Sequence, residues 1–159
     1  MFKRILVYLD GARQSERILP YAAEQARTFG SKVVLLRVGS SVPLTVSALG
    51  TEQVTIGSSV AVGIAAREEL ADAKSYLERL SEELSGQGLE VDVAAVMGPV
   101  AESIVKFIKE NSIDLVAMTA RAYSGWKRLF FGSTVEEVLR GCAVPLLVLG
   151  AEPAEAATD

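Results

Sequence analysis

Residues 4–38, RILVYLDGARQSERILPYAAEQARTFGSKVVLLRV, contain the pattern that decides the fold class. The stretch begins with RILVYL and ends with KVVLLRV, and such nearly continuous apolar runs are typical of strands covered on both faces. Between these runs, Ser15–Phe29 carries apolar residues at helical spacing, and Gly30 follows as a stop signal. The stretch therefore predicts a strand, a helix and a second, parallel strand.

The rest of the chain continues this alternation. The sequence predicts a helix over Glu68–Leu84, a strand over Leu89–Met97, a helix from Gly98-Pro99 to Asn111, a strand over Asp114–Thr119, a helix that starts at Gly132 and a strand over Ala143–Leu149. Alternating strands and helices imply right-handed crossovers and a parallel sheet with helices on both faces. We therefore predict an α/β fold built on a doubly wound, five-stranded parallel sheet.

Two segments stand outside this alternation. Residues 39–63 are rich in Ser, Val, Thr and Gly, with Glu52 as their only charge, and a loop of this length is unusual unless it is a lid, an interface or disordered. We interpret it as a mobile loop or lid, with a solvated insertion as the alternative. Residues 151–159 are small and acidic and predict a flexible tail, which leaves residues 1–150 as the domain.

The composition excludes several classes of function. A chain of 159 residues fits one domain, and its formal net charge of −4 argues against general nucleic-acid binding. It has no histidine and only one cysteine, Cys142, so histidine-based catalysis, histidine-ligated metals and a disulfide framework are excluded. No signal peptide and no apolar stretch of about 18 residues is visible. We expect a soluble, cytoplasmic protein that binds neither nucleic acid nor membrane and has no metal site.

The strongest functional signal lies in residues 115–135, LVAMTARAYSGWKRLFFGSTV. They join a buried strand to a helix that opens on Gly132, Ser133 and Thr134. A helix start offers unpaired N–H groups and the positive end of a dipole, both of which favour phosphate. Arg121 adds positive charge to the loop between strand and helix. The segment predicts a mononucleotide site, with simple capping of the helix as the alternative.

Further candidate residues follow the other strands. Asp10 comes directly after the first strand, Val38 ends the second, and Thr119 ends the fourth. Ligands of open parallel sheets bind beyond the carboxyl ends of the strands. These residues would therefore converge with the helix start if the first and fourth strands were neighbours, although Asp10 before a glycine also suits a turn cap.

Taken together, these features resemble the universal stress protein family. The opening KRILVYLDGARQSERILPYAAEQA is similar to the family's first strand, its strand-end aspartate and its first helix, and VVLLRV resembles its second strand. The segment MTARAYSGWKRLFFGSTVEEVLRGCAVPLLVL follows the family's phosphate-loop pattern of Gly, two residues, Gly, nine residues, Gly, then Ser or Thr. The resemblance covers about residues 1–150 and implies a single domain with the strand order 3-2-1-4-5.

The resemblance also implies roles for individual residues. Asp10 would contact the adenine or ribose of a bound nucleotide, and the backbone of Val38 would hold the edge of the base. Gly132, Ser133 and the amide of Thr134 would bind the phosphates. The implied ligand is ATP or AMP, with or without magnesium.

The chain departs from the family pattern at the first two glycines, which are Thr119 and Ala122 here. A hydroxyl at Thr119 can still face a sugar or phosphate, whereas Ala122 adds a β-carbon where the backbone has to approach a ligand closely. Arg121, between them, is a candidate phosphate partner or a solvated side chain. Two hypotheses result: a regulatory module that binds ATP or AMP, and a dimeric stress-linked adaptor that has lost nucleotide binding.

The resemblance implies a homodimer, and the residues themselves indicate little catalysis. The last strand, Ala143–Leu149, presents an apolar edge that can pair with the same strand of a second copy. An unidentified protein partner would recognise the nucleotide-bound or dimeric form. No catalytic residue is predicted, and slow ATP hydrolysis or self-phosphorylation on Ser133 or Thr134 is the most that we expect.

Overall fold

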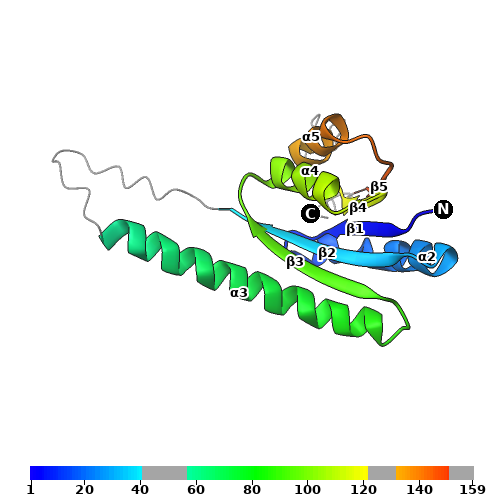
Figure 1. Cartoon of the computed structure of the whole chain (residues 1–159), viewed down its shortest axis with the longest axis horizontal. Coiled ribbons are helices and arrows are strands. Elements are labelled where there is room, and N and C mark those ends of the chain that lie inside the picture. The colour runs from blue at the N-terminus through cyan, green and yellow to red at the C-terminus, as the bar shows by residue number, and fades with distance from the viewer. Residues whose placement is uncertain (41–56, 122–131, 151–159) are drawn as a thin grey trace, which may run out of the picture.

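The structure is a computed structural model, and it describes residues 1–40, 57–121 and 132–150 (Figure 1). Its elements are β1 (Arg4–Tyr8), α1 (Arg13–Glu16), α2 (Leu19–Phe29), β2 (Lys32–Gly39), α3 (Gly57–Ser85), β3 (Val91–Met97), α4 (Val100–Glu110), β4 (Leu115–Thr119), α5 (Ser133–Gly141) and β5 (Leu146–Leu149). The strands form one parallel sheet in the order β3-β2-β1-β4-β5. The predicted α/β fold and strand order are confirmed.

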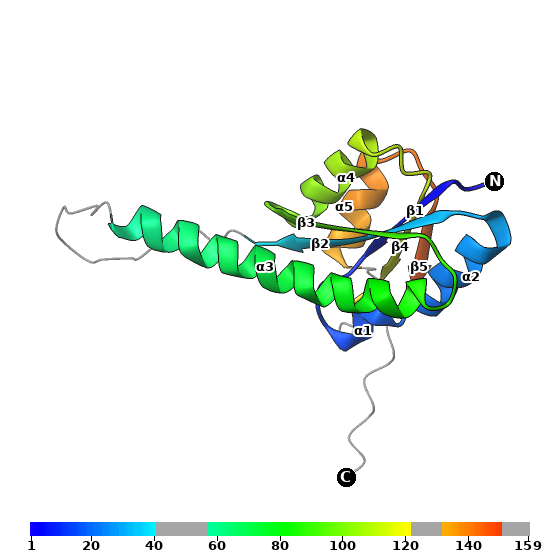
Figure 2. The same ribbon diagram turned by 60° about the horizontal axis from the view of Figure 1, so that its bottom comes forward.

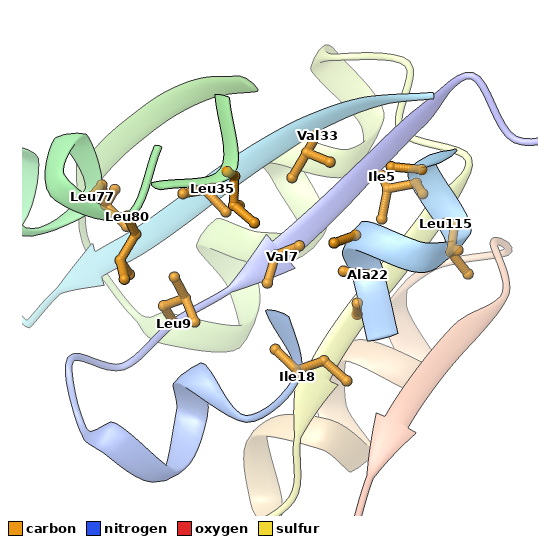
Figure 3. Packing of buried hydrophobic residues seen from close by; sticks show 14 residues of the cluster. Ile5, Val7, Leu9, Ile18, Ala22, Val33, Leu35, Leu77, Leu80 and Leu115 are labelled. Carbon is orange, nitrogen blue, oxygen red and sulfur yellow. The ribbon is translucent and has the colours of Figure 1, made fainter. Parts of the chain in front are cut away.

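Helices cover both faces of the sheet (Figures 1 and 2). Successive strand residues point to opposite faces, so β1 contributes Ile5 and Val7 to one core and Leu6 to the other. Figure 3 shows the first core, in which side chains of β1, β2 and β4 meet those of α2 and α3. In the second core, Ile104 of α4 and Val138 of α5 pack over the opposite face. Burial on both faces explains the continuous apolar runs in the sequence.

The single helix predicted over Ser15–Phe29 is wrong, because the chain forms two helices there. α1 ends at Glu16 and α2 begins at Leu19. Pro20 lies in the first turn of α2, and a proline has no N–H to bond the carbonyl of Glu16, so a continuous helix would be broken at this point. Gly30 ends α2 with a left-handed φ of 63°, as the sequence predicted.

The helix predicted over Glu68–Leu84 begins earlier, at Gly57. The predicted loop over residues 39–63 is therefore wrong at both ends, since Gly39 pairs with Met97 as the last residue of β2 and residues 57–63 are helical. Gly and Ser are weak helix formers, which explains why the early turns escape a sequence-based prediction. Residues 41–56 lie outside the described residues, as does the predicted tail at 151–159.

The first turns of α3 extend beyond the sheet in both views (Figures 1 and 2). The later part of the helix packs on the sheet through Leu77, Leu80 and Leu84. Among the described residues, no helix combines the length and apolar composition that crossing a membrane requires.

The last strand is shorter than predicted. β5 begins at Leu146, whereas the prediction began at Ala143. Pro145 directly precedes β5 and has no N–H to donate to a ladder, although its carbonyl accepts a hydrogen bond from the Val116 N–H at 3.0 Å. β5 is the edge strand beside β4, and within the described residues no strand pairs with its other side.

Tyr76 connects α3 to α1. Its hydroxyl donates to Glu16 Oε1 at 3.0 Å, and the guanidinium carbons of Arg37 and Arg79 lie 5.3 and 5.7 Å from its ring centroid. Burial, and then the hydrogen bond to Glu16, raises the pKa of Tyr76 well above its ordinary value of 10.0. The folded protein therefore favours the protonated form of the Tyr76 phenol.

We expect Tyr76→Phe to lower the free energy of unfolding by about 1.5 kcal/mol near neutral pH, because the hydrogen bond to a carboxylate is lost. This difference should shrink above pH 10. The pKa is raised in the folded protein, so the phenol of the unfolded chain ionises first and the stabilisation is lost as the pH rises toward the folded-state value. Urea unfolding of both proteins at about pH 8 and about pH 11 measures the effect.

Tyr21→Phe is the control for this experiment, because that ring is 54% exposed. It should change the free energy of unfolding by less than about 0.5 kcal/mol at either pH. A Tyr76→Phe difference that stays constant between the two pH values would contradict the assignment.

Candidate functional site

A cavity of about 230 Å³ opens at the carboxyl ends of β1 and β4. Its walls come from the ends of these two strands and from the starts of α4 and α5: Tyr8, Asp10, Val100, Met118, Thr119, Arg121, Gly132, Ser133, Thr134 and Val135. β1 and β4 are neighbours, and the helices that follow them lie on opposite faces of the sheet. This is the switch point at which doubly wound folds bind ligands.

All the predicted site residues except one line this cavity. Asp10, Thr119, Arg121, Gly132, Ser133 and Thr134 all line it. Val38 does not; it is buried against the α4 and α5 side of the sheet. It lies two residues beyond the last pair of β1 and β2, Tyr8 and Leu36. A role for its backbone in holding a base remains a prediction.

Both carboxylate oxygens of Asp10 are engaged. Oδ1 accepts a hydrogen bond from the Ala12 N–H at 2.9 Å, which closes the turn after β1. Oδ2 lies 3.3 Å from the Arg121 guanidinium. The Asp10 side chain is 20% exposed and that of Arg121 is 73% exposed. Asp10 is therefore both a turn cap and the acidic wall of the cavity.

Thr119 links the end of β4 to α1. Its hydroxyl donates to the Ser15 carbonyl at 3.4 Å, so toward the cavity it retains the acceptor capacity of its oxygen. Ser15 is itself buried and donates to the Ala12 carbonyl at 2.7 Å. These contacts fix the end of β4 against the same turn that holds Asp10.

The start of α5 forms the wall of the cavity that is suited to an anion. Gly132, at the N-cap position, has φ 94° and ψ 147° and carries no side chain that could cap the helix. The first-turn N–H groups of Ser133, Thr134 and Val135 lack a partner within the helix by its geometry. With the positive end of the helix dipole they favour a phosphate or carboxylate. The structure places Gly132 at the N-cap position, so it is also compatible with the alternative interpretation, in which Gly132 and Ser133 simply cap the helix.

Sequence reasoning missed the apolar wall of the cavity. Tyr8, Val100, Met118 and Val135 supply it. Burial, and then the Asp10 carboxylate, raises the pKa of Tyr8, so its phenol is neutral at physiological pH. The two-residue spacing of Tyr8 and Asp10 could have identified Tyr8, because alternate residues of an extended segment share a side.

The site therefore combines an acidic acceptor, an exposed cation, a helix start whose N-cap residue is a glycine, and an apolar wall. Such a combination suits a ligand that has an anionic group and an apolar ring system. Within the described parts of the chain, no group of three or more His, Cys, Asp or Glu side chains is arranged to hold a metal ion.

Comparisons with known proteins agree with this architecture. Universal stress protein YxiE of Bacillus subtilis (strain 168) is 26% identical over 149 residues, which cover 94% of this chain and 99% of YxiE. A universal stress protein solved in complex with cAMP is 16% identical with a TM-score of 0.66, over 95% of this chain and 98% of that one. A universal stress protein from Archaeoglobus fulgidus, solved in complex with dAMP, is 22% identical with a TM-score of 0.54, over 95% and 98% of the two chains.

These solved structures share the fold of this chain. The family model of the universal stress proteins matches residues 1–150, which include every strand of the sheet and every described wall of the cavity. The chain belongs to the universal stress protein family.

Proposed function

We propose that this chain is a regulatory module that binds an adenine nucleotide, ATP or AMP, in the cavity between β1 and β4. The observation that carries the proposal is that the start of α5 and the carboxylate of Asp10 line one cavity. The first suits a phosphate, and the second suits a ribose hydroxyl or an adenine amino group. The complexes of other universal stress proteins with cAMP and dAMP support this choice of ligand class.

The bound nucleotide would lie across the switch point of the sheet. Its phosphates would contact Gly132, Ser133 and Thr134, and its base would lie toward the carboxyl end of β2, where the backbone of Val38 is a candidate contact. Magnesium would then enter with the phosphates of ATP, because no cluster of acidic side chains among the described residues offers it a separate site. The module would act in the cytoplasm through the surface that changes with occupancy.

A dimeric adaptor without nucleotide is the second candidate. Two departures from the family pattern favour it: the hydroxyl of Thr119 already bonds the Ser15 carbonyl, and Ala122, outside the described residues, replaces a glycine. The outer edge of β5 is the surface through which two copies would pair. This dimer is also compatible with the nucleotide-binding module.

Calorimetric titration of nucleotide-free protein with ATP and with AMP, in the presence of magnesium, tests the proposal. We expect micromolar binding of at least one of them. Asp10→Ala should weaken that binding about tenfold, because a hydrogen bond to a charged group contributes about 1.5 kcal/mol or more. Asp72→Ala, at an exposed position on α3, is the matched control and should leave the affinity unchanged.

The outcome distinguishes the two candidates. If neither nucleotide gives heat or raises the melting temperature, the nucleotide-binding module is excluded and the adaptor is favoured. If binding occurs and Asp10→Ala leaves it unchanged, the carboxylate of Asp10 does not contact the nucleotide.

A further inference from the structure

We infer that Arg121 makes this site selective for phosphorylated ligands, because a nucleoside has to compete with Arg121 for Asp10 unless a phosphate takes Arg121 from it. This inference rests on the proposed function. It concerns which ligands the site accepts, whereas the proposed function concerns whether it accepts an adenine nucleotide at all.

The first step is the state of Asp10. Its Oδ1 is held by the Ala12 N–H at 2.9 Å and its Oδ2 by the Arg121 guanidinium at 3.3 Å. A ribose hydroxyl or adenine amino group therefore competes with Arg121 for Oδ2. A neutral nucleoside would have to break this ion pair and offers the guanidinium no anionic group in exchange.

The second step is which partner moves. Asp10 is anchored in the turn after β1, where Gly11 has a φ of 88°, and its side chain is 20% exposed. Arg121 is 73% exposed, and within the described part of the chain Asp10 is its ion-pair partner. Exposed ion pairs at such distances contribute little to stability. The Arg121 guanidinium is therefore the partner that can move away, while Asp10 stays in place.

The third step is what a phosphate offers. Arg121 lines the same cavity as the first-turn residues Ser133 and Thr134 of α5. A phosphate bound at this helix start is a better partner for a guanidinium than one carboxylate oxygen, because it has more charge and can accept two parallel hydrogen bonds. Transfer of Arg121 to the phosphate releases Asp10 Oδ2 for the nucleoside part of the same ligand.

This exchange of Arg121 from Asp10 to the phosphate predicts that Arg121→Gln changes the affinities for AMP and adenosine in opposite directions. Calorimetric titration with AMP should show an affinity lowered about tenfold, because a charged contact to phosphate is lost. Titration with adenosine should show an affinity raised about two- to fivefold, since the exposed pair no longer competes for Asp10. The ratio of the two affinities should therefore fall by more than tenfold.

Two further variants make the test specific. Arg140→Gln removes a similar exposed arginine, paired with Glu136 at 3.8 Å in the same helix α5, and should change neither affinity. In an Asp10→Asn background, Arg121→Gln should no longer raise the affinity for adenosine, because the pair is already broken.

The possible outcomes separate the two proposals. If wild-type protein binds AMP and Arg121→Gln lowers both affinities or changes neither, the exchange is wrong while the proposed function stands. If the wild type binds neither AMP nor ATP, the proposed function fails and the exchange fails with it. Circular dichroism of each variant confirms that it is folded.

Discussion

Replacing Ile104 by alanine is expected to lower the free energy of unfolding by about 3 kcal/mol, within the range of about 2–5 kcal/mol for such truncations of a core. Ile104 is fully buried on α4, in the core that joins α4 and α5 to the sheet. Truncation removes apolar contacts and leaves a cavity that the packed strands cannot close, because the same core includes Leu6 and Val116 of the inner strands β1 and β4. Urea unfolding followed by circular dichroism measures the loss.

Leu139→Ala is the matched control, since Leu139 is 58% exposed on α5. That substitution removes a similar volume from a residue that contributes little burial, and should cost less than about 0.5 kcal/mol. Equal losses at the two positions would show that α4 does not pack on the sheet as described.

The fold was predictable because burial on both faces leaves a direct mark on the sequence. Val33 to Leu36 are buried one after another, which only a central strand of a layered α/β fold requires. The helix–strand alternation then restricts the topology, since crossovers are right-handed. The strand order itself came from the family resemblance, because no pattern within one strand identifies its neighbours.

The errors arose where local chemistry overrides periodicity. The apolar spacing of Ser15–Phe29 persists across the interruption between α1 and α2, although Pro20 forbids a continuous helix. The early turns of α3 were missed for the opposite reason, because Gly57, Ser58 and Ser59 at its start have weak helix propensity. Boundaries of this kind depend on single residues and on tertiary context.

The polar half of the site was predictable and the apolar half was not. Asp10 follows the first strand, Thr119 is the last residue of β4 and Ser133 begins α5, and such positions can be recognised in a single sequence. Val100 lines the cavity only because the starts of α4 and α5 lie on the same face of the sheet. These two helix starts are far apart in the sequence. Their proximity can be inferred only once the topology of the sheet is known.

Gly132→Ala is expected to weaken nucleotide binding by at least about tenfold while the protein remains folded. Gly132 has φ 94° and ψ 147°, a conformation that is essentially restricted to glycine and costs other residues about 1–3 kcal/mol. Alanine would relieve this strain by rotating the backbone just before α5. The N–H groups of Ser133 and Thr134 would then turn away from the cavity, and a phosphate would lose the donors that the proposed function assigns to it.

Gly30→Ala provides a control with matched backbone strain. Gly30 also has a positive φ, 63°, at the end of α2, and a β-carbon there would meet no atom within 4 Å. Its replacement should lower the free energy of unfolding by about 1 kcal/mol, as for other left-handed positions, and should leave nucleotide affinity unchanged. Calorimetric titration with AMP of both variants, alongside their urea unfolding, separates loss of stability from loss of the anion site. If Gly132→Ala binds as tightly as Gly30→Ala, the phosphate does not contact the start of α5, and the ligand must be held by Asp10 and the strand ends alone.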